Sequence, residues 1–161
     1  MRKATKTTMA LVLGVVLSLL ALMPATAQDK PADSMQLVRD KIRADKKLFV
    51  SENMQLSESE AKAFWPVYEK YQDELFLLRS RTAALIRDYV EASKDMSNAT
   101  ARKLLDEALT IESLGLKLRK TYLPKFRQVL PEKKVLRYYQ IENKIQAALY
   151  YELAREIPIV Q

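Results

Sequence analysis

Large apolar and aromatic side chains recur every three, four or seven residues through the middle of the chain. This spacing places them on one side of an α-helix, which has 3.6 residues per turn. No long segment alternates apolar and polar residues as a half-buried strand would. The pattern therefore predicts an all-α fold. Its strongest carriers are Phe64, Tyr68, Tyr71, Leu75, Leu78, Leu85 and Tyr89.

Two serine residues mark where long helices begin. Ser57 is followed three residues later by Glu60, the spacing of a capping box, and Ser97 stands in the same relation to Thr100. Pro131 opens a last helix, because proline is well tolerated at a helix start. We expect one short and three longer helices in antiparallel hairpins. The expected ranges of the first, second and fourth helices are about 34–50, 58 to about 93, and 131 to about 155, with Pro66 kinking or interrupting the second. The third helix starts after Ser97, and Pro124 bends it near its end or stops it there.

The composition excludes several kinds of chemistry. The chain has no Cys, no His and only two Gly. Disulfides, thiolate or imidazole metal sites, Ser-His-Asp catalysis and Gly-rich phosphate loops are therefore excluded. Paired carboxylates that could act as an acid and a base, such as Asp73 with Glu74 or Asp106 with Glu107, fall among polar positions, where solvated helix faces are expected. The sequence predicts no enzyme, no metal site and no cofactor.

Residues 1–27 have the organisation of a secretory signal peptide. A basic start is followed by an uncharged apolar run over residues 9–23, then Pro24 and small residues up to Ala27. An uncleaved membrane anchor is the alternative, but the run is shorter than the roughly 20 residues that span a membrane. We therefore expect a periplasmic domain formed by residues 28–161.

Basic residues are concentrated in residues 117–137, which we call the basic segment. It contains eight Lys or Arg residues and a single acidic residue, Glu132. Such a segment is either a solvated face or a positive surface that attracts unfolded proteins, anionic lipid headgroups or envelope polymers. Export makes a nucleic-acid partner unexpected. The residues predicted to contact clients are Arg119, Lys120, Arg127, Lys133, Lys134 and Arg137.

A tyrosine doublet follows the basic segment. Tyr138 and Tyr139 are neighbours, so they point about 100° apart on a helix. One of them can face the core while the other faces outward or sideways. The outward tyrosine would make apolar contacts with a bound polypeptide, a role for which tyrosine is well suited.

Four consecutive apolar residues predict a second contact surface. They are Leu75, Phe76, Leu77 and Leu78. Such a run circles its helix, so one core cannot cover every side. Another copy of the chain is the favoured cover, and a further helix of the same chain or an exposed client-binding patch are the alternatives.

Three short segments resemble the LTxxQ motif of the periplasmic Spy/CpxP-like proteins. They are Leu56-Ser57-x-x-Glu60, Met96-Ser97-x-x-Thr100 and, more weakly, Leu130-Pro131-x-x-Lys134. Ser replaces Thr twice, and Glu, Thr and Lys stand where Gln is usual. Residues 64–68 and 137–144 are also similar to exported helical proteins of this kind.

The resemblance implies four helices in a curved, cradle-like antiparallel dimer. It also implies ATP-independent chaperone or envelope-stress activity on a concave face that mixes basic and apolar residues. Metal sensing in such relatives uses His, which this chain lacks. We therefore expect a homodimer that binds unfolded or envelope proteins, with weak contact to anionic membrane surfaces. The alternative is a regulatory or structural module for one envelope partner, such as a sensor kinase domain.

Overall fold

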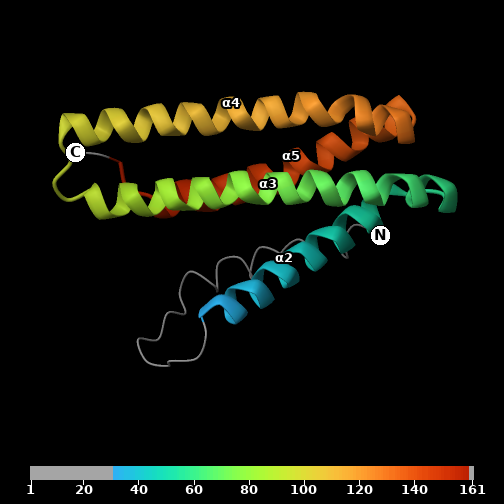
Figure 1. The fold of residues 1–161 in the computed structure, drawn as a ribbon, viewed down its shortest axis with the longest axis horizontal. Helices are drawn as coiled ribbons and strands as arrows, with labels where there is room; N and C mark the ends of the chain where they lie inside the picture. The colour runs from blue at the N-terminus through green and yellow to red at the C-terminus, as the bar shows by residue number, and fades with distance from the viewer. Residues whose placement is uncertain (1–30, 160–161) are drawn as a thin grey trace. The chain divides into compact units, whose positions relative to one another are not determined.

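The computed structural model describes the backbone of residues 31–159 and the side chains from Asp40 to Ile159. The signal peptide expected at residues 1–27 lies outside this range. The described part forms four helices and contains no strand, so the predicted all-α fold is confirmed (Figure 1). The helices are α2 (Pro31–Met54), α3 (Glu58–Ala92), α4 (Asn98–Val129) and α5 (Glu132–Glu156).

The chain divides into two compact units. The hairpin unit contains residues 56–137 and also residues 150–159. Among the described residues, the α2 unit contains residues 31–55 together with residues 138–149, the central part of α5. None of the described helices is both long enough and apolar enough to cross a membrane.

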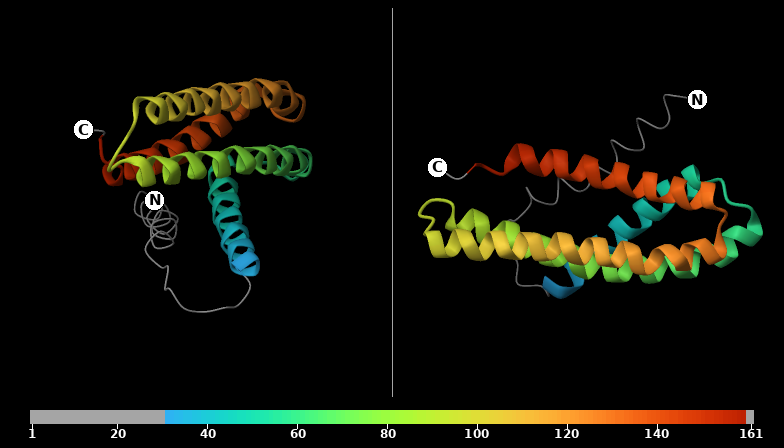
Figure 2. Two further views of the ribbon diagram at one scale, coloured as in Figure 1. Left: turned by 60° about the vertical axis from the view of Figure 1, so that its left-hand side comes forward. Right: turned by 90° about the horizontal axis from the view of Figure 1, so that it is seen from above.

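The two long helices of the hairpin unit begin at the predicted serine caps. The Ser57 hydroxyl accepts a hydrogen bond from the Glu60 N–H at 3.3 Å, and the Glu60 carboxylate accepts one from the Ser57 N–H at 2.7 Å. Ser97 accepts from the Thr100 N–H at 3.1 Å. Both predicted starts are thus confirmed. In both views of Figure 2, α3 and α4 run side by side in opposite directions.

Neither internal proline interrupts its helix. Pro66 lies inside α3 and Pro124 inside α4. Each proline removes the hydrogen bond to the carbonyl four residues earlier, which belongs to Lys62 or Lys120. Both prolines and both lysines are exposed, so water can hydrogen-bond the released carbonyls. This location explains why the helices continue to Ala92 and Val129.

The core of the hairpin unit is built from aromatic rings. Phe64 of α3 and Phe126 of α4 are completely buried, with ring centroids 5.8 Å apart. Tyr71 and Tyr122 pack edge to face at 5.2 Å. These rings are the inward members of the helix-period pattern, and their burial supplies a large apolar area. Farther along the hairpin, a Cβ at Gly115 would lie 3.4 Å from Leu78, which shows how closely the helices approach there.

The α2 unit is organised around a longer helix than the sequence predicts. α2 extends beyond the expected residues 34–50 to Pro31–Met54, nearly the length of α5. It ends where Gln55 adopts φ 51°, a left-handed conformation that commonly terminates helices. Within this unit the Lys46 ammonium lies 2.8 Å from the Glu142 carboxylate, and both side chains are buried.

Candidate functional site

The basic segment forms a tight helical corner in the hairpin unit. It covers the last turns of α4 and the first turns of α5, which are joined by Leu130 and Pro131. Leu130 is buried and anchors the corner. Arg127 and Glu132 form an ion pair across the corner at 2.8 Å between Nε and Oε1. The segment is therefore presented by helical backbone rather than by a loop.

The predicted client-contact residues differ in accessibility. Lys134 forms an ion pair with Glu60 of α3, so this side chain ties the start of α5 to the start of α3. The hydrogen bond from Lys134, together with that from the Ser57 backbone, lowers the pKa of Glu60. Arg119 is half-buried. The exposed members are Lys120, Arg127, Lys133 and Arg137.

The tyrosine doublet divides its two members between core and surface. Tyr138, in the α2 unit, has no exposed surface, and its hydroxyl donates a hydrogen bond to Glu142 at 3.1 Å. Tyr139 is half-buried, with its ring centroid 5.8 Å from that of Tyr138. Tyr138 therefore belongs to the core, and only Tyr139 has surface available for a partner.

A row of exposed leucines on α4 was not predicted from the sequence. We call Leu105, Leu109 and Leu116 the leucine stripe; they are 61%, 55% and 55% exposed. Steps of four and seven residues place them on one face of α4, and the same steps lead on to exposed Lys120 and Arg127. The signal in the sequence is a second apolar series on this helix, offset from the core series of Ile111, Tyr122 and Phe126.

The apolar run of Leu75, Phe76, Leu77 and Leu78 lies along the line of contact between α3 and α4. Leu77 is 69% exposed, whereas its three neighbours in the run are half-buried. Leu77 and Leu78 line a shallow groove of about 310 Å³ with Leu114 and Leu118 of α4. We call this the leucine groove. A further helix of the hairpin thus covers part of the run, and Leu77 stays open.

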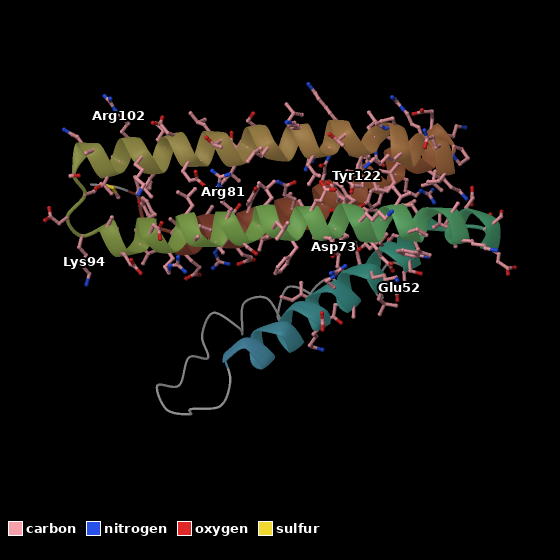
Figure 3. All side chains as sticks on the ribbon, in the orientation of Figure 1. Glu52, Asp73, Arg81, Lys94, Arg102 and Tyr122 are labelled. Carbon is pink, nitrogen blue, oxygen red and sulfur yellow. The ribbon has the colours of Figure 1, made fainter. Side chains whose placement is uncertain are left out.

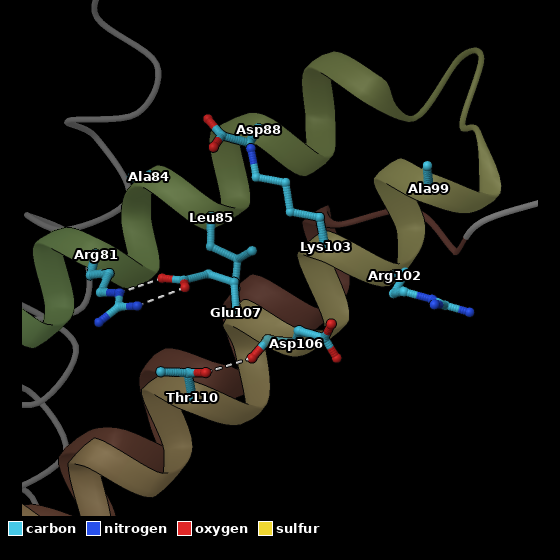
Figure 4. A pocket seen from close by; sticks show the side chains of 10 residues that line it. All are labelled: Arg81, Ala84, Leu85, Asp88, Ala99, Arg102, Lys103, Asp106, Glu107 and Thr110. Atoms are coloured by element: carbon cyan, nitrogen blue, oxygen red, sulfur yellow. Dashed lines mark hydrogen bonds and ion pairs between the residues drawn. The ribbon is translucent and has the colours of Figure 1, made fainter.

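A charged groove of about 530 Å³ lies nearer the α3–α4 turn. In Figure 4 the Arg81 and Glu107 side chains point toward one another and form a bidentate ion pair. The Arg81 Nε donates to Glu107 Oε1, and the Arg81 Nη2 donates to Glu107 Oε2 at 2.7 Å. Hydrogen bonding to Arg81 lowers the pKa of Glu107. Three basic and three acidic residues line the groove, so it offers no net charge to a ligand of one sign. The ion pair between Arg81 and Glu107 in this groove links α3 to α4.

The phenol of Tyr122 links α4 to α3 beside the aromatic core. Its hydroxyl donates a hydrogen bond to Glu74 at 2.6 Å. In Figure 3 Tyr122 and Arg81 lie between the two helices, whereas Lys94 and Arg102 project away from them. Burial, together with the neighbouring Glu74 carboxylate, raises the pKa of Tyr122 to about 12.

This shift predicts a stability loss in alkali. From about pH 10 the unfolded chain loses the phenolic proton, while the folded chain keeps it until about pH 12. The folded state then binds more protons, so its stability falls as the pH rises through this range, by roughly 1–3 kcal/mol. Tyr122→Phe should show a smaller loss between pH 10 and 12 in denaturant titrations. The exposed Tyr151→Phe variant serves as the control, and identical pH dependences for Tyr122→Phe and wild type would contradict the assignment.

The described residues contain no group of three or more acidic side chains arranged to hold a metal ion. No protein-family model matches the chain, and neither curated proteins nor solved structures match it significantly. The function therefore has to be argued from the surfaces described above.

Proposed function

We propose that this chain is an exported, periplasmic, ATP-independent chaperone-like protein that binds unfolded polypeptides. The expected signal peptide and the resemblance to Spy/CpxP-like proteins support the location and the class. One observation carries the binding role. A single face of α4 presents the leucine stripe followed by exposed Lys120 and Arg127.

This face combines two forces with different ranges. The basic residues attract acidic regions of a client over about a Debye length, which raises the rate of encounter. The leucines then offer apolar contact without a deep pocket. Because each exposed side chain buries little area, individual contacts are weak and the client can leave. Neither step needs a nucleophile, a metal or a nucleotide.

Charge reversal within the basic segment should weaken this activity. The assay dilutes two unrelated denatured proteins into buffer without ATP and follows light scattering in the presence of residues 28–161. We expect suppression of both aggregations, weaker at high salt because the charges are screened. The double variant Lys120→Glu/Lys133→Glu should require roughly three- to tenfold more protein for equal suppression.

A matched variant separates local charge from net charge. Lys62→Glu/Lys70→Glu makes the same change at two exposed lysines of α3, outside the basic segment. It should retain suppression. Equal loss in both double variants would show that only net charge matters. No suppression by the wild-type chain at several-fold excess would reject the chaperone proposal and favour a module for one envelope partner.

We also propose that two copies associate through the leucine groove. Leu77 is the exposed member of the predicted dimer residues, and Leu114 and Leu118 extend its apolar surface onto α4. Leu77→Asp should shift the molar mass at micromolar concentration from dimer to monomer, because association would bury the carboxylate. Leu48→Asp changes a leucine of similar exposure on α2 and should remain dimeric. A monomeric wild-type chain would remove both the dimer and the cradle from the proposal.

A further inference from the structure

An apolar groove of about 370 Å³ lies in the hairpin unit beside the turn that joins α3 to α4. We call it the hairpin groove. Its lining includes Leu85 and Ile86 of α3, Met96 of the turn and Leu104 of α4. Its α4 residues, at positions 101, 104, 105 and 108, share one side of the helix, and none of them lines the charged groove, so the hairpin groove occupies another side of α4. Almost no polar atoms face this groove.

The segment that follows α5 is already seated at this groove. α5 ends at Glu156, and Ile157 has an extended backbone with φ −87° and ψ 117°. Ile157 is one of the residues that line the groove. The hydroxyl of Tyr89, another lining residue, donates a hydrogen bond to the carbonyl oxygen of Pro158. An extended segment thus contacts the apolar groove through Ile157 and is held by a hydrogen bond to its backbone at Pro158.

These contacts indicate that another segment can displace residues 157–159 from the hairpin groove. Ile157 is only partly buried, and Ile159, two residues farther on, is 91% exposed. The volume of about 370 Å³ is the space that remains in the groove with Ile157 in place. One partly buried side chain and one neutral hydrogen bond hold an extended segment weakly, because each contributes little net free energy in water. A segment of the same chemistry with more apolar residues could bury more of the groove.

We propose that the hairpin groove binds extended apolar polypeptide segments, and that residues 157–159 occupy it within the same chain as a competitor. The single hydroxyl donor at the rim favours a peptide over an acyl chain, which has no carbonyl repeat to use it. Leu105 belongs to both the hairpin groove and the leucine stripe, so the two surfaces are continuous. The inference rests on the proposed function for its natural partner, an unfolded polypeptide. Its physical claim is separate, because recognition here involves no charge.

The test measures binding of a labelled peptide with the sequence of residues 154–161 by fluorescence anisotropy. Three proteins are compared: residues 28–161, residues 28–156, and residues 28–161 with the substitution Ile157→Asp. A tethered segment competes at high effective concentration. We therefore expect both altered chains to bind the peptide roughly tenfold more tightly than the wild type. Adding Tyr89→Phe to the Ile157→Asp chain should reverse several-fold of this gain, whereas adding Tyr151→Phe should leave it unchanged.

Several outcomes would overturn the inference. They are an unchanged affinity in the Ile157→Asp chain, equal binding of a peptide with serine in place of both isoleucines, and an affinity that falls steeply with salt, which would indicate the basic segment. Displacement of the peptide by a medium-chain detergent with no effect of Tyr89→Phe would assign the groove to acyl chains. Dimers that disappear when the chain ends at Glu156 would place the segment in a second copy. Because the peptide assay uses no aggregating client, failure of the chaperone assay leaves its result interpretable.

Discussion

Phe126→Ala should lower the free energy of unfolding by about 3–5 kcal/mol. Phe126 has no exposed surface, and its ring contacts Phe64 and Tyr71 of α3, each with 5.8 Å between centroids. Truncation removes the buried ring and leaves a cavity between two long helices that cannot easily collapse. Alanine is the best helix former, so helix propensity does not cause the loss. The change is a large fraction of the roughly 5–15 kcal/mol that stabilises a typical domain.

The single tryptophan of the chain allows this prediction to be checked locally. Trp65 lies in the hairpin unit, with its ring 5.0 Å from that of Phe64, so its fluorescence reports on the same core. Denaturant titrations followed by this signal give the change in unfolding free energy. Leu116→Ala, on the same helix but 55% exposed, should change it by less than about 0.5 kcal/mol. Equal effects of the two substitutions would contradict the aromatic core.

Local sequence signals predicted the helices of the hairpin unit well, because caps act over three or four residues. The serine at position 57 and the glutamate three residues later satisfy each other's backbone groups, so the start of α3 was predictable without tertiary information. The effect of Pro66 was not predictable in this way. Whether a proline disrupts a helix depends on where its released carbonyl points, and the exposure of Lys62 depends on the packing of the whole helix.

The surfaces were predicted less completely than the helices. The basic segment is locally visible, but the pairing of Lys134 with Glu60 joins residues 74 positions apart. Two adjacent tyrosines on a helix predict one inward and one outward side chain, and only packing decides that Tyr138 is the inward one. The leucine stripe was missed because its residues also fit a simple apolar helix pattern. A helix with two apolar series separated by about a third of a turn is the signal to look for in such chains.

The buried ion pair of the α2 unit was beyond any local pattern, since Lys46 and Glu142 are 96 residues apart. Removing Lys46 by Lys46→Met should cost about 3–5 kcal/mol of unfolding free energy. The substitution keeps the length of the side chain but removes the ammonium 2.8 Å from the Glu142 carboxylate, whose side chain is only 5% exposed. A buried carboxylate that loses this cation retains its desolvation cost without the attraction that offset it. Amide hydrogen exchange along residues 40–54 should therefore accelerate.

The double variant Lys46→Met/Glu142→Leu isolates the charge interaction from packing. Burying two charges is costly, so replacing both by apolar groups of similar size often changes stability little. We expect the double variant to be more stable than Lys46→Met alone and to lie within about 1 kcal/mol of the wild type. The Tyr138 hydroxyl, which donates to Glu142 at 3.1 Å, would lose that acceptor, so Tyr138→Phe in the double background should restore part of any remaining deficit. If the stability loss of the double variant equals the sum of the losses caused by Lys46→Met and Glu142→Leu separately, the two side chains are not coupled. Apolar packing by Phe49, Val50 and Met54 would then hold α2 in the unit.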